Sequence, residues 1–148
     1  MFVVTKGQRH PCFASVREID SSFVERQGEC LLLREPESWT ELERSARDYY
    51  GRLTRAAESI FLWLDDFLPD DLKARIVADQ AAWLSFRKTR FAALNLLYGL
   101  LSGTMTSADR TALHLARAAV VRNRALELED FYLQFHARRR HAGLAAVR

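Results

Sequence analysis

The chain has 148 residues, enough for one domain with a core, and its 49% hydrophobic and 28% charged residues are typical of a soluble globular protein. Arg or Asp interrupts every long apolar run, which excludes a membrane-spanning helix, and two cysteines are too few for a disulfide framework. The net charge of +3 is uneven, because residues 1–74 carry ten basic and fourteen acidic side chains and residues 75–148 carry twelve and five. A basic half can contact nucleic acid or a membrane surface, but we favour packing of two halves of opposite charge.

The first residues contain no apolar run of secretory length, which predicts a cytoplasmic protein. The alternative is a periplasmic or secreted protein whose export signal was removed. Cys12 and Cys30 would be free, buried thiols in the first case and could form one disulfide in the second.

Residues 1–37 are predicted to be an irregular segment that packs on the rest of the chain. Their short apolar runs lean towards β-structure, and Gly, Pro and Asp separate them. One alternative is a small hairpin in which residues 22–26 and 29–33 flank a turn at Gln27-Gly28. The other is a short helix at about residues 14–19.

A first long helix is predicted over residues 38–67. SWTE at 38–41 fits a capping box, in which Ser38 accepts a backbone hydrogen bond and Glu41 reaches back to the cap. Gly51 lies within the helix, where it costs up to about 1 kcal/mol relative to Ala, so we expect a close neighbour there. The predicted buried stripe is Leu42, Ala46, Tyr49, Leu53, Ala56, Ile60, Trp63 and Phe67.

A second helix is predicted over residues 70–102. It contains the most apolar run of the chain, residues 79–104, around which we expect the fold to be organised. Its predicted inner stripe is Leu72, Ile76, Gln80, Trp83, Arg87, Phe91, Leu94, Tyr98 and Leu101.

A third helix is predicted to begin at the cap TSAD, residues 106–109, and to fray into a basic tail at 138–148. Its predicted apolar residues are Leu115, Ala118, Ala119, Ala125, Leu126, Leu128, Tyr132 and Phe135. Three helices of roughly thirty residues with short loops predict an all-α, antiparallel up-down-up bundle over residues 38–137. Together with segment 1–37 and tail 138–148, it would form a single domain.

The register of the bundle predicts specific contacts. Folding at the two loops places Trp83 between the small residues Gly51 and Ala125. It also places Arg87 level with Asp48, which we expect to be its counter-ion because an unpaired buried charge is very costly.

Gln80 comes level with Leu128 of the third helix and Glu58 of the first. We therefore interpret Gln80, Trp83 and Arg87 as an internal brace rather than a ligand site.

The run QAAWLSFR at residues 80–87 resembles the signature "AQraWl-x-[YF]-R" of the lysozyme inhibitor LprI-type N-terminal domain family. Glu41-Leu42 and Tyr49-Tyr50 resemble its "eLn…aY" helix, and Gly103-Thr104 and RNRALEL at 122–128 resemble its later segments, so the similarity spans about residues 38–130. The resemblance implies a small bacterial helical bundle and inhibition of a lysozyme-like hydrolase. The family's usual cysteines and signal peptide are absent here, which implies an intracellular relative held together by packing.

No catalytic constellation is visible. Cys12 and His10 could pair as nucleophile and base, but the sequence offers no third group to orient them. The four histidines lack paired metal-ligand spacing, the carboxylates lie at helix starts and solvent faces, and there is no Gly-rich phosphate loop. We expect no enzyme, no cofactor and no metal site.

Arg138, Arg139 and Arg140 are the candidate binding residues, since a basic run can hold nucleic-acid phosphate or anionic lipid. We favour the alternative of a solvated tail that interacts with the helix dipole.

The sequence therefore predicts a non-enzymatic module that binds another protein, as an inhibitor or immunity-type protein against a lysozyme-like hydrolase or toxin. The alternative is a nucleic-acid-associated helical protein that uses the basic second half. An apolar flank on such a bundle would also be compatible with a homodimer.

Overall fold

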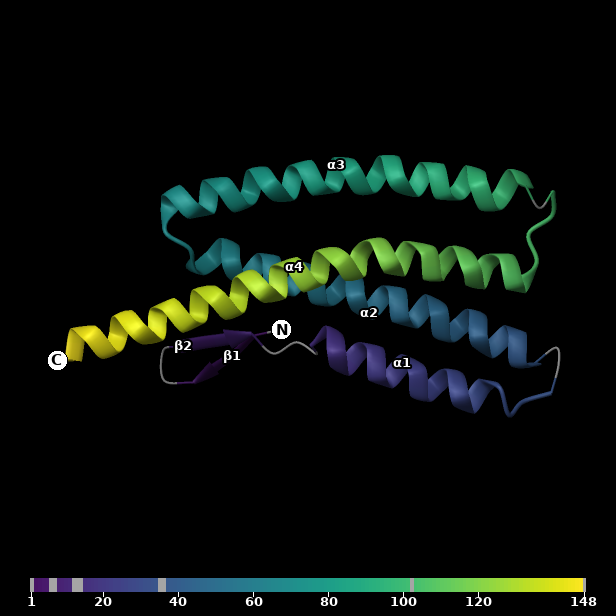
Figure 1. Cartoon of the computed structure of the whole chain (residues 1–148), viewed down its shortest axis with the longest axis horizontal. Coiled ribbons are helices and arrows are strands. Elements are labelled where there is room, and N and C mark those ends of the chain that lie inside the picture. The colour runs from purple at the N-terminus through teal and green to yellow at the C-terminus, as the bar shows by residue number, and fades with distance from the viewer. Residues whose placement is uncertain (1, 6–7, 12–14, 35–36, 102, 148) are drawn as a thin grey trace.

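The computed structural model describes the backbone of residues 2–5, 8–11, 15–34, 37–101 and 103–147, and side chains within 15–34, 37–99 and 103–138. Its elements are β1 (Phe2–Thr5), β2 (Gln8–Pro11), α1 (Val16–Cys30), α2 (Glu37–Phe67), α3 (Asp70–Leu101) and α4 (Ser107–Val147) (Figure 1). The strands pair as a small antiparallel hairpin. The predicted all-α class is confirmed, but the described part of the chain holds four helices rather than three.

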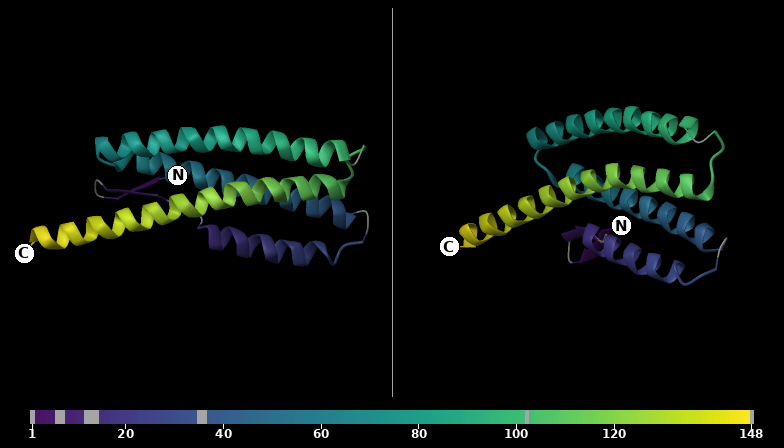
Figure 2. Two further views of the ribbon diagram at one scale, coloured as in Figure 1. Left: turned by 45° about the horizontal axis from the view of Figure 1, so that its top comes forward. Right: turned by 45° about the vertical axis from the view of Figure 1, so that its right-hand side comes forward.

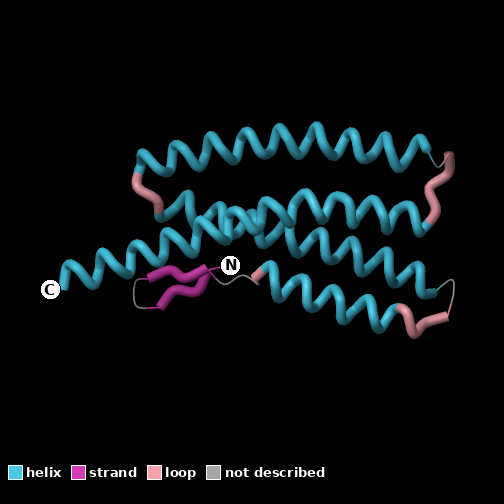
Figure 3. The backbone as a smooth tube through the Cα atoms, viewed as in Figure 1, coloured by secondary structure: helices cyan, strands magenta, loops and turns pink. Residues whose placement is uncertain are grey.

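The two central helices, α2 and α4, run parallel and lie side by side. Helix α3 runs antiparallel to both along one edge, and α1 lies along the opposite edge (Figures 1 and 2). Short loops join α2 to α3 and α3 to α4, and the C-terminal part of α4 extends beyond the other helices (Figure 3). In the described ranges, no helix combines the length and apolar character needed to cross a membrane.

The prediction that residues 1–37 are irregular is wrong for α1. Ser15 caps this helix: its Oγ accepts a hydrogen bond from the Glu18 backbone at 3.2 Å, and Glu18 Oε2 accepts one from Ser15 N at 3.2 Å. The expected hairpin at residues 22–33 is absent, because Gln27-Gly28 lies inside the helix. The alternative prediction, a helix at about residues 14–19, overlaps the start of α1 but is shorter than the observed helix.

The predicted cap at Ser38 is also wrong, because α2 already begins at Glu37 and Ser38 is buried within its first turn. Glu41, expected to complete that cap, instead accepts hydrogen bonds from Arg26 and Arg44 at 2.9 Å and 2.6 Å. The Glu41 carboxylate therefore pairs with two exposed arginines rather than with the backbone at the start of α2.

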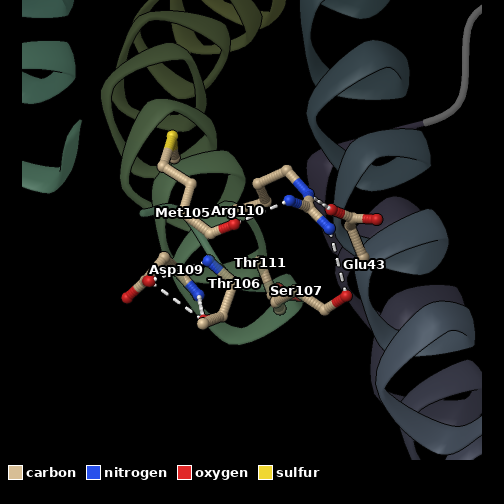
Figure 4. Close-up of polar contacts among 7 residues, drawn as sticks. All are labelled: Glu43, Met105, Thr106, Ser107, Asp109, Arg110 and Thr111. Atoms are coloured by element: carbon tan, nitrogen blue, oxygen red, sulfur yellow. Dashed lines mark hydrogen bonds and ion pairs between the residues drawn. The ribbon is translucent and has the colours of Figure 1, made fainter. Parts of the chain in front are cut away.

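The predicted start of the third long helix is confirmed. Thr106 Oγ1 accepts a hydrogen bond from Asp109 N at 3.2 Å, and Asp109 Oδ2 accepts one from Thr106 N at 2.9 Å (Figure 4). The backbone hydrogen bond from Thr106, followed by that from its hydroxyl, lowers the pKa of Asp109. Arg110 then joins this terminus to α2, since it donates to Met105 O at 3.0 Å and pairs with Glu43.

The core lies between α1, α2 and α4. Helix α2 contributes the predicted stripe almost unchanged, and α4 contributes residues at heptad spacing. The core residues are Val16 and Ile19 of α1, Leu53, Ala56, Ala57, Ile60, Trp63 and Leu64 of α2, and Ala118, Val121, Ala125 and Leu128 of α4. Leu115, Ala119 and Leu126, predicted as part of the α4 stripe, lie outside this core.

Helix α3 is not the centre of the fold, contrary to prediction. None of its described side chains is buried, and its inner residues Ile76, Trp83 and Phe91 are only partly covered by the core. Its apolar side chains occur all round the helix, so several face outwards: Leu72, Val77, Leu84, Phe86, Leu96 and Leu97. The three-helix bundle is therefore replaced by a core of three helices with α3 attached outside it.

The backbone of the predicted basic tail continues α4 as far as Val147. The expectation of a frayed tail at residues 138–148 is therefore wrong for 138–147. Arg138 is exposed, and the side chains of Arg139 and Arg140 lie outside the described residues.

A polar cluster joins α1 to both central helices. Asp20 accepts hydrogen bonds from Tyr49 Oη of α2 at 2.5 Å and from Arg122 Nη2 of α4 at 2.8 Å. Burial alone would raise the pKa of Asp20, but these hydrogen bonds and the charge of Arg122 outweigh it and lower the pKa. Burial first, and then the bond to Asp20, raises the pKa of Tyr49 to about 12.

The Tyr49 hydroxyl is predicted to make stability decline in alkali. Because its pKa is higher in the folded state, the unfolded chain loses this proton first, and stability falls as the pH rises from 10 to about 12. Tyr49→Phe keeps the ring, which stacks on Phe23 at 4.2 Å, but removes this proton. Urea unfolding across this pH range should show a shallower decline for Tyr49→Phe. Equal slopes for the two proteins would contradict the assignment.

The position of the core predicts a sharp contrast between two leucines. Leu53 of α2 is 0% exposed, so Leu53→Ala should lower the free energy of unfolding by about 2–5 kcal/mol. Leu96 of α3 is 59% exposed, so Leu96→Ala should change it by less than about 1 kcal/mol. Denaturant unfolding measures both. A comparable loss in the two variants would place α3 in the core after all.

Candidate binding groove

Gln80 and Trp83, two of the predicted signature residues, are brought together by Arg124 of α4. Gln80 Oε1 accepts hydrogen bonds from Arg124 Nη2 at 2.8 Å and Nε at 3.2 Å. The guanidinium carbon of Arg124 lies 5.7 Å from the Trp83 ring centroid, within reach of a cation–π interaction. These contacts join α3 to α4, as a brace would.

Arg87, the third signature residue, also lies over Trp83, with its guanidinium carbon 5.0 Å from the ring centroid. Its expected counter-ion, Asp48, lies elsewhere and lines a pocket between α1 and α2. No ion pair between the two occurs in the described part of the chain. Arg87 is only half-buried, so it keeps contact with water and does not need the carboxylate.

Gly51 does not make room for Trp83 as expected. The three atoms closest to a methyl group added at Gly51 all belong to the Arg55 side chain, the nearest of them at 3.4 Å. Ala125, the other expected neighbour, is fully buried in the core cluster against which Trp83 packs. On α4 the observed partner of Gln80 is Arg124, one helical turn from the predicted Leu128, and the register did not determine which way each side chain points.

Arg124 is the central residue of this brace. It was not among the brace residues predicted from the sequence. It is only 3% exposed, yet it carries a full charge. Asp79 of α3 and Glu127 of α4 neutralise it, with oxygens 2.8 Å and 3.1 Å from Nη1. A signal was available, because the predicted register placed Gln80 one helical turn from this arginine.

A second arginine of α4 also holds α3. Arg117 lies over Phe91, with its guanidinium carbon 5.7 Å from the ring centroid, and donates to the Asn95 side chain. Tyr50 of α2 contacts the same phenylalanine, with ring centroids 6.0 Å apart. Helix α3 is therefore attached by half-buried aromatic and cationic contacts rather than by a buried apolar interface.

One flank of the α3–α4 contact is open. A hollow of about 370 Å³ lies near Leu72, Ile76 and Phe131, and one of about 780 Å³ lies near Trp83 and Leu94. The α3 residues that line them recur every three or four positions on one face, and the same is true of α4. The two hollows therefore lie along one flank of the α3–α4 contact, where the Asp79–Arg124 ion pair joins a residue of each, and we call them together the α3–α4 groove.

The groove combines an apolar floor with charged walls. Its apolar surface includes Phe86, which is 55% exposed although it is a large aromatic side chain. Four arginines line it, Arg75, Arg90, Arg124 and Arg138, against two carboxylates, Asp79 and Glu127. Both carboxylates are paired with Arg124, and the four arginines outnumber them, so the net charge of the groove is positive.

Other clusters offer less chemistry. The α1–α2 pocket, of about 310 Å³, contains Arg26 and Arg44, both paired with Glu41. Within the described ranges, no three His, Cys, Asp or Glu side chains gather as metal ligands. Cys30 is a buried free thiol, and the side chains of His10 and Cys12 lie outside the described residues.

The chain matches no family model, no curated protein and no solved structure. The similarity of residues 80–87 to the lysozyme inhibitor LprI-type signature therefore remains a prediction from the sequence.

Arg124 is predicted to hold α3 in place. Arg124→Ala removes hydrogen bonds from a buried charged donor and should lower the free energy of unfolding by about 2–4 kcal/mol. Glu127→Gln is the control, because this partner is largely exposed and its pair should be worth less than about 1 kcal/mol. Amide hydrogen exchange should rise along α3 in Arg124→Ala but remain slow in α2. Equal effects of the two substitutions would argue against this role.

Proposed function

We propose that the protein is a non-enzymatic module that binds another protein through the face formed by α3 and α4. The observation that carries the proposal is that α3, the most apolar helix, has no buried side chain among its described residues. Large apolar side chains on every side of a helix are normally covered by neighbouring elements. Water-exposed apolar patches of this kind commonly mark interaction sites.

The groove gives this binding face a shape. Interfaces are strongest where large apolar or aromatic side chains and arginine meet a partner in a desolvated pocket. Phe86, Trp83 and Arg90 lie together in the larger hollow and supply such a combination. By contrast, the described clusters offer no paired nucleophile and base, which favours binding over catalysis.

The resemblance of residues 80–87 extends the proposal to an inhibitor or immunity-type protein directed against a lysozyme-like hydrolase or toxin. Under this hypothesis the signature residues brace α3, and the partner contacts the open flank rather than the signature itself. Titration with purified hydrolases of this class, followed by calorimetry and by cell-wall hydrolysis assays, tests the extension separately.

Site-specific photo-crosslinking tests the binding face. A photoreactive benzoylphenylalanine replaces Phe86 in the groove, and in a control chain it replaces Val24, which is 65% exposed on α1. In cells of the source organism, irradiation should give discrete protein adducts at Phe86 and none at Val24. Adducts at neither position, or nucleic acid at Phe86, would refute the proposal.

A further inference from the structure

The α3–α4 groove has an unbalanced charge that bears on the partner. Arg75, Arg90 and Arg138 are exposed along it, and none of the three forms an ion pair within the described part of the chain. The groove's two carboxylates both bind the buried Arg124, and four arginines against two carboxylates leave the groove a net charge of +2. Three cationic groups therefore remain along an apolar floor.

We propose that the α3–α4 groove binds an amphipathic α-helix of another protein, whose apolar stripe is flanked by aspartate and glutamate. This inference rests on the proposed function and names the chemistry of its partner. Apolar residues of the bound helix would cover Phe86 and the floor of the groove. The flanking carboxylates would pair with the three arginines.

The dimensions and the walls of the groove favour a helix. Between Leu72 and Leu94 the groove runs for roughly 33 Å, the length of a helix of about 22 residues. Both walls are α-helices, and the backbone N–H and C=O groups of each are hydrogen-bonded within that helix. An extended strand placed in the groove would therefore find no backbone groups to pair with. A helix satisfies its own backbone and needs only an apolar stripe at three- and four-residue spacing.

The same charges argue against a second copy of this chain. A two-fold axis would place two identical grooves, both of net positive charge, face to face. Like charges brought together at an interface cost binding energy and suppress that pairing. An acidic helix removes this repulsion and gains ion pairs.

Nucleic acid is also less suited to the groove. Phosphates could contact the arginines, but they would leave the apolar floor beneath uncovered. Bases bind such surfaces by stacking on the exposed faces of aromatic side chains. In the described residues Trp83 is occupied by Arg87 and Arg124, which leaves Phe86 and Phe131 as the exposed rings, one in each hollow.

Binding of designed peptides to the full chain tests the inference. Three fluorescent peptides of 22 residues are used: a leucine-striped helix with glutamate flanks, the same helix with lysine flanks, and a scrambled glutamate peptide. Anisotropy should show the glutamate-flanked helix binding at least about tenfold tighter than either control, with an affinity that falls as salt rises.

Charge reversal locates the contact. Arg75→Glu combined with Arg90→Glu should invert the preference, so that the lysine-flanked helix binds more tightly. Arg17→Glu combined with Arg47→Glu, at exposed positions outside the groove, should leave the preference unchanged. Circular dichroism and thermal unfolding verify that each double variant is folded.

The alternative outcomes are distinguishable. Equal binding of both striped peptides, or no peptide binding while Phe86 still crosslinks a protein, overturns the acidic helix but leaves the proposed function standing. Self-association in sedimentation that Phe86→Ser abolishes, without peptide binding, identifies a second copy as the occupant. Tighter binding to duplex DNA or RNA than to the acidic peptide also overturns the inference.

Discussion

The close parallel contact between α2 and α4 is the constraint on which the rest of the structure depends. Small residues occupy it, among them Ala56 and Ala57 of α2 and Ala118 and Ala125 of α4, all of them buried. Small side chains let two helix axes approach closely and leave a narrow, well-filled seam. Helix α1 completes this seam on one side with Val16 and Ile19. Helix α3 lies against the outside of this core, and none of its described side chains is buried.

Because α3 lies outside the core, its attachment to the other helices depends on polar and cation–π contacts. Its partners are Arg124 and Arg117, which supply hydrogen bonds and cation–π contacts where a core helix would have buried leucines. Such contacts fix direction and register, but they cover little apolar surface. Local stability follows the density of buried contacts, so α3 should open at a lower free energy than α2 or α4. A surface that must receive a partner benefits from this, since it can adjust without unfolding the core.

The difference between the predicted and observed folds has identifiable causes. The stripe of α2 was predictable because its apolar residues keep one face and its outer face is charged. Helix α3 lacks that contrast, and a helix that is apolar on all sides fits a protein interior and an unfilled interface equally well. Helix α1 was obscured by β-leaning residues, although Ser15 and Glu18 carry its capping box in the sequence. Asp48 was assigned from its level along the bundle, whereas its direction around α2 places it in the pocket between α1 and α2.

Arg124 connects the fold to the proposed binding. Burying its charge between α3 and α4 requires carboxylates nearby, and Asp79 and Glu127 provide them from the two walls of the groove. The same pairing engages the only two carboxylates that line the groove in the described residues, where four arginines outnumber them. The interaction that attaches α3 therefore also leaves the groove positive. A chain that exposes an apolar helix risks pairing with itself, and unpaired arginines beside that helix oppose this while they favour an acidic partner. Attachment of α3 and selection of its partner thus follow from one buried charge.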